Sequence, residues 1–215
     1  MKARGVSVRR ALENFGYGFY VMIRPIYGFE EMKNEGKGSA PAAAAVALLA
    51  VFAFLLETHN TGFIFSTFNP NEYNVIRHLA GAAVPFALWC AANWCVSVVL
   101  DGEGSLKYIF MAACYALAPY IVFTLAATGL SNVLLYEEQM FIKYASGLGT
   151  LWSGLLLFTG SMVIHQYTVR RTVLSFVLSV FGILLMMFIA ILFASVLDKI
   201  YRFAAGIYNE VRLRM

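Results

Sequence analysis

Charge is what this sequence has least of. Only 13% of its 215 residues are Asp, Glu, Lys or Arg, whereas soluble domains have roughly a quarter. With 60% hydrophobic residues, the chain cannot be a soluble globular protein, because only lipid can solvate so apolar an outer surface. The 16 basic and 12 acidic residues are scattered along the chain. This excludes a nucleic-acid-binding face and favours anionic lipid as a partner.

Cysteines and catalytic motifs are also scarce. The three cysteines lie inside apolar runs, so a disulfide framework is not expected. The sequence contains no HExxH, GxSxG, CxxC or phosphate-binding glycine motif. Glu137 and Glu138 are adjacent acids, but no His or Arg accompanies them, so they indicate a solvated loop. We therefore expect no enzymatic activity, no metal site and no cofactor.

Long apolar runs, in contrast, are abundant. A helix needs about 20 mostly apolar residues to cross a bilayer. Five segments meet this requirement, namely residues 40–56, 79–100, 108–130, 144–169 and 172–197. The sequence thus predicts an all-α, polytopic integral membrane protein with a bundle of five transmembrane helices. No cleavable signal peptide is expected, because a long charged segment precedes the first run.

Both ends of the chain are predicted to form amphipathic helices. In residues 1–39, apolar side chains recur at helical spacing until Pro25; they are Val8, Leu12, Phe15, Phe19 and Met22. In residues 198–215, an apolar stripe from Ile200 to Val211 lies opposite charged side chains. Such helices bind at the membrane surface.

Among the connecting segments, only residues 57–78 form a long loop. Its aromatic side chains are too few to span a membrane and too many to leave in water. They include Phe63, Phe65 and Phe68, which we expect to contact the interface or another protein. The segment DGEGSLK at 101–107 is a short glycine turn that forces the second and third spans into an antiparallel hairpin.

The positions of Lys and Arg indicate the orientation. With a cytoplasmic N-terminus in the cell membrane, ten of the 16 basic residues lie inside, which favours this multi-pass orientation. The basic C-terminal segment then lies outside. A missed sixth span is the competing explanation for that segment.

Few polar side chains lie at bilayer depth, where they are rare unless they have a role. Asn93 lies in the second span, and an interhelical hydrogen bond is favoured over a substrate site. His165 lies near the end of the fourth span, before Arg170 and Arg171. For His165 an interfacial position at the cytoplasmic exit is favoured over a proton relay.

Prolines and small residues predict how the helices bend and pack. Pro85 and Pro119 lie within the second and third spans and predict kinks there. Small residues recur at every fourth position in several spans, and Gly154 belongs to one such row. These rows predict close packing within the bundle in preference to homodimerisation.

Four features in order resemble the Yip1 domain family, in particular its short bacterial members. They are RPIYGFEEMKNEGKGS before the first span, DGEGSLKYIF entering the third, YALAPY within it, and LWSGLLLFTGSMVIHQYTVRRTV in the fourth. The resemblance covers nearly the whole chain. It implies a compact bundle of five helices, a cytoplasmic N-terminus and a non-enzymatic role.

These observations favour a membrane scaffold or accessory subunit, which acts by contact with lipid and other membrane proteins, such as transporter permease subunits of a bacterial inner membrane. The alternative is a transporter or channel for a small-molecule or lipid-like solute, with Asn93, Tyr115 and Tyr120 along the route. A third hypothesis is a membrane-shaping protein that acts through its two terminal helices.

Overall fold

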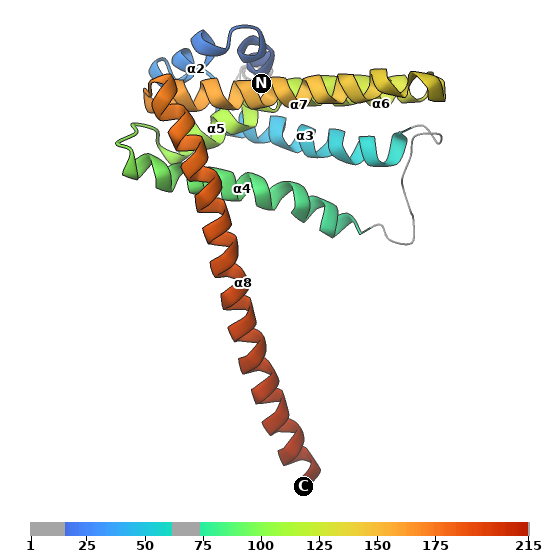
Figure 1. Ribbon diagram of the computed structural model, residues 1–215, viewed down its shortest axis with the longest axis vertical. Helices are drawn as coiled ribbons and strands as arrows, with labels where there is room; N and C mark the ends of the chain where they lie inside the picture. The colour runs from blue at the N-terminus through green and yellow to red at the C-terminus, as the bar shows by residue number, and fades with distance from the viewer. Residues whose placement is uncertain (1–15, 62–73, 215) are drawn as a thin grey trace, which may run out of the picture.

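The computed structural model describes residues 16–61 and 74–214, which form helices joined by short connections (Figure 1). Residues 16–23 are helical, and the elements that follow are α2 (Pro25–Asn34), α3 (Ala40–Asn60), α4 (Val75–Val99), α5 (Leu106–Ala116), α6 (Ala118–Ser131), the 3₁₀ turn η1 (Tyr136–Glu138), α7 (Gln139–His165) and α8 (Val169–Arg214). The predicted all-α fold is confirmed. Val8, Leu12, Phe15, Phe63, Phe65 and Phe68 lie outside the described residues.

Within the described residues, five helical segments are long and apolar enough to cross a membrane, which confirms the predicted number. Their bounds differ from the predicted ones: the first span continues to Asn60 and the fourth ends at His165. Gln166 ends α7 because its backbone is left-handed, with φ of 56°. Hydropathy does not reveal such a turn, since it depends on backbone conformation.

The segment before the first span packs onto the bundle. Helical residues 16–23 bury Tyr17 and Val21, while Phe19, a member of the predicted apolar stripe, is 52% exposed. Pro25 does not end the helical region, because it occupies the first turn of α2, where its missing N–H is not needed. The helix α2 then buries Phe29 and Met32 in the main core. Neither hydropathy nor helical periodicity predicted α2.

The two prolines within the spans have different effects. At Pro119 the third span is interrupted, and α5 and α6 meet at Leu117. The backbone N–H of Tyr120 therefore lacks its helical acceptor and donates to Oγ of Ser153 in α7, at 3.0 Å. Pro85 lies inside α4, which remains one helix from Val75 to Val99.

Four spans pack side by side, whereas α8 leaves them (Figure 1). The first turns of α8 pack on α4 and bury Thr172, Ser175 and Ser179. Beyond these turns α8 points away from the other spans. Only 6% of an apolar stretch of 18 residues in α8 is buried within the protein. The arrangement is thus more open than the compact bundle that the resemblance implies. Residues 198–214 continue α8 without a break.

Candidate functional site

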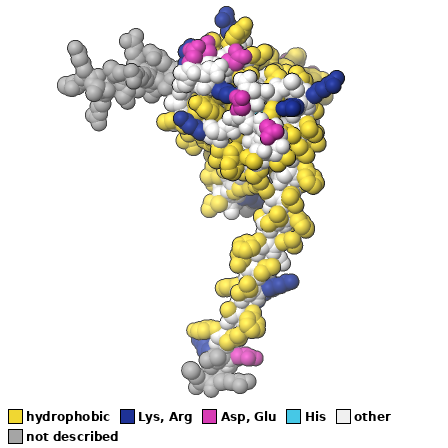
Figure 2. All heavy atoms as spheres, turned by 90° about the vertical axis from the view of Figure 1, so that its left-hand side faces the viewer, with side chains coloured by type: hydrophobic (Ala, Val, Ile, Leu, Met, Phe, Trp, Pro, Cys, Tyr) yellow, Lys and Arg dark blue, Asp and Glu magenta, His cyan; other side chains and the backbone are white. Residues whose placement is uncertain are grey.

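Three segments, one helix and two turns, lie at the same end of the bundle (Figure 1). They are α2, the α4–α5 turn at 100–105 and the α7–α8 turn at 166–168. Figure 2 faces this end and shows that acidic and basic side chains gather there, while the surface of α8 is mostly hydrophobic. Charged side chains therefore gather on this end of the bundle.

His165 and Asn93 meet inside this end. Nε2 of His165 lies 2.9 Å from Oδ1 of Asn93, and since Oδ1 can only accept, the imidazole N–H donates. The Asn93 side chain is fully buried and His165 is 2% exposed. Asn93 thus makes the interhelical bond that the sequence favours. His165 is the last residue of α7 and lies buried against Asn93 of α4. The interfacial position expected for it stays a prediction.

The glycine turn encloses the His165 ring. A Cβ atom on Gly104 would lie 2.6 Å from Nδ1 of His165, and one on Gly102 would lie 2.8 Å from the same atom. Side chains do not approach this closely, so both positions require glycine. On the other side, Tyr167 stacks on His165 with 5.1 Å between ring centroids. We call His165, Asn93, Tyr167, Gly102 and Gly104 the histidine cluster.

Three buried polar atoms of the histidine cluster have no hydrogen-bond partner among the residues that the structure describes. They are Nδ2 of Asn93, Nδ1 of His165 and the hydroxyl of Tyr167. Within the described ranges, no group of three His, Cys, Asp or Glu residues could hold a metal ion. The charged neighbour of His165 is Lys33, whose ammonium pairs with Glu103 at 2.7 Å. The cluster therefore joins helices, and within the described ranges no carboxylate hydrogen-bonds to the imidazole.

The helix α2 is held by its own hydrogen bonds and ion pairs. The Tyr17 hydroxyl donates to the carbonyl of Gly28 at 2.5 Å, and burial raises the pKa of Tyr17. The Lys37 ammonium donates to Glu31 at 3.0 Å and holds the pKa of that carboxyl below its usual value. Hydrogen bonds to Glu35 and Glu31 raise the pKa of Lys37. Glu31 and Lys37 are therefore ionised and paired at neutral pH, while the Tyr17 hydroxyl keeps its proton.

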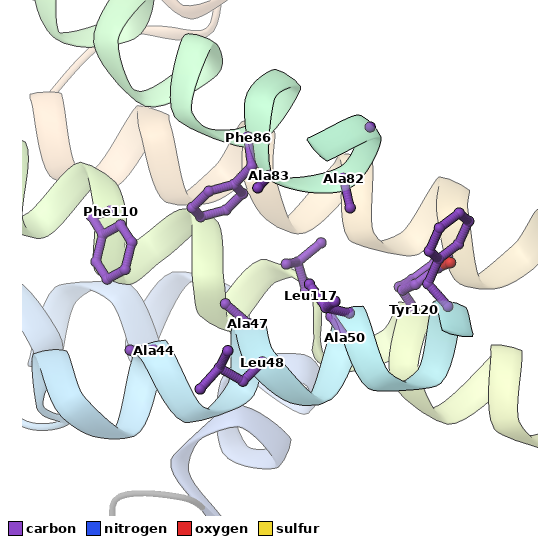
Figure 3. A pocket seen from close by; sticks show the side chains of 13 residues that line it. Ala44, Ala47, Leu48, Ala50, Ala82, Ala83, Phe86, Phe110, Leu117 and Tyr120 are labelled. Carbon is purple, nitrogen blue, oxygen red and sulfur yellow. The ribbon is translucent and has the colours of Figure 1, made fainter. Parts of the chain in front are cut away.

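A separate apolar groove, which we call the α3–α4 groove, lies between those two helices (Figure 3). Its volume is about 600 Å³, and six of the 13 residues that line it are Ala or Gly. Figure 3 shows Phe86 and Phe110 toward one end and Tyr120 toward the other. The rings of Phe86 and Phe110 form a T-shaped pair with centroids 5.8 Å apart.

The residues expected along a transport route do not share one cavity. Only Tyr120 lines the α3–α4 groove, while Asn93 belongs to the histidine cluster. Tyr115 is fully buried, and its hydroxyl accepts the backbone N–H of Ser39 at 3.3 Å. The structure therefore separates these three side chains.

Two glycines of α7 pack closely against other helices, but Gly154, which the sequence predicts to do so, is not one of them. Gly154 is exposed, and a Cβ there would meet nothing within 4 Å. Gly149 instead lies against Phe123 of α6, and Gly160 against Phe29 of α2. Spacing along one helix could not reveal them, because the aromatic partners come from other elements.

These observations define a class, the polytopic α-helical membrane proteins, in which buried polar groups join helices. Residues 19–191 match the Yip1 domain. The chain therefore belongs to the Yip1 domain family, whose members are generally non-enzymatic membrane proteins. It matches no curated protein and no solved structure.

Proposed function

We propose that the protein is a membrane scaffold or accessory subunit that acts through contact with lipid and with another membrane protein, such as a transporter permease. The observation that supports this role most directly is α8. Only 6% of its most apolar window is buried within the chain, compared with 28–56% for the other four spans. Much of this helix is thus available to partners.

The α8 surface has features that suit a helical partner. Close approach between helices in lipid needs small residues. Ser175 and Ser179 supply them where α8 packs on α4, and both are buried. Ala190 and Ala194 repeat the same spacing further along α8, where both are exposed. A transmembrane helix of another protein could pack there in the same way.

The proposal includes an orientation in the cell membrane, with the α2 end in the cytoplasm. Arg24, Lys107, Arg170 and Arg171 lie at or beside this end of the described chain. Basic residues are retained on the cytoplasmic side and attract anionic lipid headgroups. The charge of this end therefore supports both the orientation and the lipid partner.

Site-specific photocrosslinking in cells tests the proposed role. A photoreactive residue at Ala190 or Ala194 is expected to capture another membrane protein of one defined mass. The same residue at Ser179, which faces α4, serves as the matched control and should give little intermolecular product. Products with lipid alone at Ala190 and Ala194 would count against a scaffold.

A second candidate, a transporter of a lipid-like solute, is favoured by the α3–α4 groove. A flux assay in liposomes separates the two functions, because a scaffold on its own moves no solute. Transport by the purified protein, lost when Gly81→Leu narrows the groove, would support this second function.

A further inference from the structure

The facing walls of the α3–α4 groove on α3 and α4 carry a set of small residues. Ala44, Ala47 and Ala50 recur at intervals of three along α3, which places them on one face of the helix. The opposite wall of α4 presents Gly81, Ala82 and Ala83. Because the two helix backbones do not close up here, the small side chains on both walls leave the space between them unfilled. A hollow of about 600 Å³ there is within the range of ligand-binding pockets, roughly 300–1,000 Å³.

One end of the groove is apolar and the other is polar. Phe86 and Phe110 line it at the apolar end, as Figure 3 shows. At the opposite end Phe54 lines the groove, and its ring centroid lies 6.2 Å from that of His78 on α4. The Tyr120 hydroxyl lies beside the half-buried carboxylate of Glu57. A ligand that fills the groove therefore has an apolar body and a polar head.

The two walls carry opposite charges at this polar end. Glu57 follows Phe54 by three residues on α3, and Arg77 precedes Gly81 by four on α4. Residues at these intervals share a helix face, so each charge lies about one turn beyond a residue that lines the groove. A head with separate cationic and anionic groups matches this pair better than a head of one sign.

We propose that the α3–α4 groove binds one acyl chain of a zwitterionic aminophospholipid, with the phosphate toward Arg77 and the ammonium toward Glu57. The ammonium N–H groups can donate to the Glu57 carboxylate, and the guanidinium can donate to the phosphate. The acyl chain supplies the van der Waals contacts that the lining of an empty groove lacks. This inference does not depend on the scaffold role, since lipid binding is measured without a partner protein.

Native mass spectrometry of the full-length protein in detergent tests the proposal. The probes are phosphatidylethanolamine and phosphatidylglycerol with identical acyl chains. The wild-type protein is expected to retain one phosphatidylethanolamine about tenfold more strongly than phosphatidylglycerol. The reason is that phosphatidylethanolamine can form an ion pair with Glu57, whereas phosphatidylglycerol has no ammonium group. Glu57→Gln should remove this preference and still retain an acyl chain.

Groove-filling variants separate the groove from the rest of the surface. Ala83→Phe fills the groove and should abolish retention of the lipid. Val84→Phe is the matched control, because Val84 is the next residue, is 54% exposed and does not line the groove. If Ala83→Phe does not fold, Gly81→Leu is the second variant, since a Cβ at Gly81 meets nothing within 4 Å.

Two results would overturn the inference. One is equal retention of the two lipids by the wild-type protein, and the other is unchanged retention by a folded groove-filling variant. A protein dimer that Gly81→Leu disrupts, with no bound lipid, would instead assign the groove to a second copy of the chain.

Discussion

At the residue scale, the histidine cluster shows how a polar group can serve helix packing in a membrane protein. The imidazole of His165 binds Asn93 on one side and stacks on Tyr167 on another. Gly102 and Gly104 let the turn approach the same ring. A histidine within a membrane span often indicates a proton pathway, but the contacts of His165 join α4, α7 and the turn between α4 and α5.

The close approach of Gly104 to His165 predicts a large effect of a single methyl group. Gly104→Ala should lower the free energy of unfolding by about 1–3 kcal/mol, because the added Cβ overpacks the cluster. Thermal unfolding in detergent measures this loss. Gly154→Ala is the control and should be neutral or slightly stabilising, since its Cβ meets open space. Equal unfolding temperatures for both variants would contradict the tight packing.

At the element scale, the third span illustrates how a broken helix is repaired by its neighbour. Pro119 cannot continue the hydrogen bonds of α5, and the span divides at Leu117. Ser153 on α7 accepts the Tyr120 N–H that the break leaves over. The repair joins α6 to α7, so the break contributes to the packing of two spans.

This repair predicts coupling between Ser153 and Pro119. Ser153→Ala should destabilise the protein by about 1 kcal/mol, because the Tyr120 N–H then lacks its acceptor. In a Pro119→Ala background, a continuous helix can supply a backbone acceptor, and the effect of Ser153→Ala should shrink. A double-mutant cycle of unfolding free energies measures the coupling.

Thr150→Ala provides the control for this cycle. The Thr150 hydroxyl donates to the Ser146 carbonyl of its own helix, at 3.0 Å, on an exposed surface. Its loss should matter little in either background. Strictly additive effects of Ser153→Ala and Pro119→Ala would show that the hydrogen bond from the Tyr120 N–H to Ser153 does not depend on Pro119.

At the scale of the whole molecule, α8 is what sets this protein apart from a closed bundle. Its 46 residues extend about 69 Å at 1.5 Å per residue, more than twice the roughly 30 Å of a hydrocarbon core. Charged side chains gather at the opposite end of the molecule, around α2 (Figure 2). The molecule thus combines a charged end with a long arm that is apolar until its last turns, where Arg202 pairs with Asp198.

The positions of the connections predict which residues face which side of the membrane. In a Cys95→Ser background, an impermeant thiol reagent should label Glu35→Cys only from the cytoplasm and Glu137→Cys only from outside. The reason is that an odd number of spans, α3, α4 and α5 with α6, separates the two positions. Labelling of both positions from the same side would contradict the span count. Labelling of Glu35→Cys only from outside and of Glu137→Cys only from the cytoplasm would show that the orientation is opposite to the proposed one.

Of the kinks predicted at Pro85 and Pro119, only the second coincides with an interruption of a span. The amino-acid sequence by itself determined the class of protein and the number of spans, and it predicted the bend at Pro119 and an interhelical hydrogen bond at Asn93. These follow from local quantities, namely hydropathy over about 20 residues, the missing N–H of proline and the cost of a buried amide. The helix α2, the true ends of the spans and the left-handed turn at Gln166 were not predicted, because each depends on backbone conformation or on contacts with distant residues.

Only the tertiary structure decided which polar and small residues meet. Asn93 and His165 are 72 residues apart, and no periodicity within one helix can pair them. Gly149 and Gly160 are tight because aromatic rings from α6 and α2 reach them, while Gly154, in the same helix, faces open space. Hydropathy records how well each segment dissolves in lipid, whereas pairing depends on the orientation of whole helices, which is a property of the folded molecule.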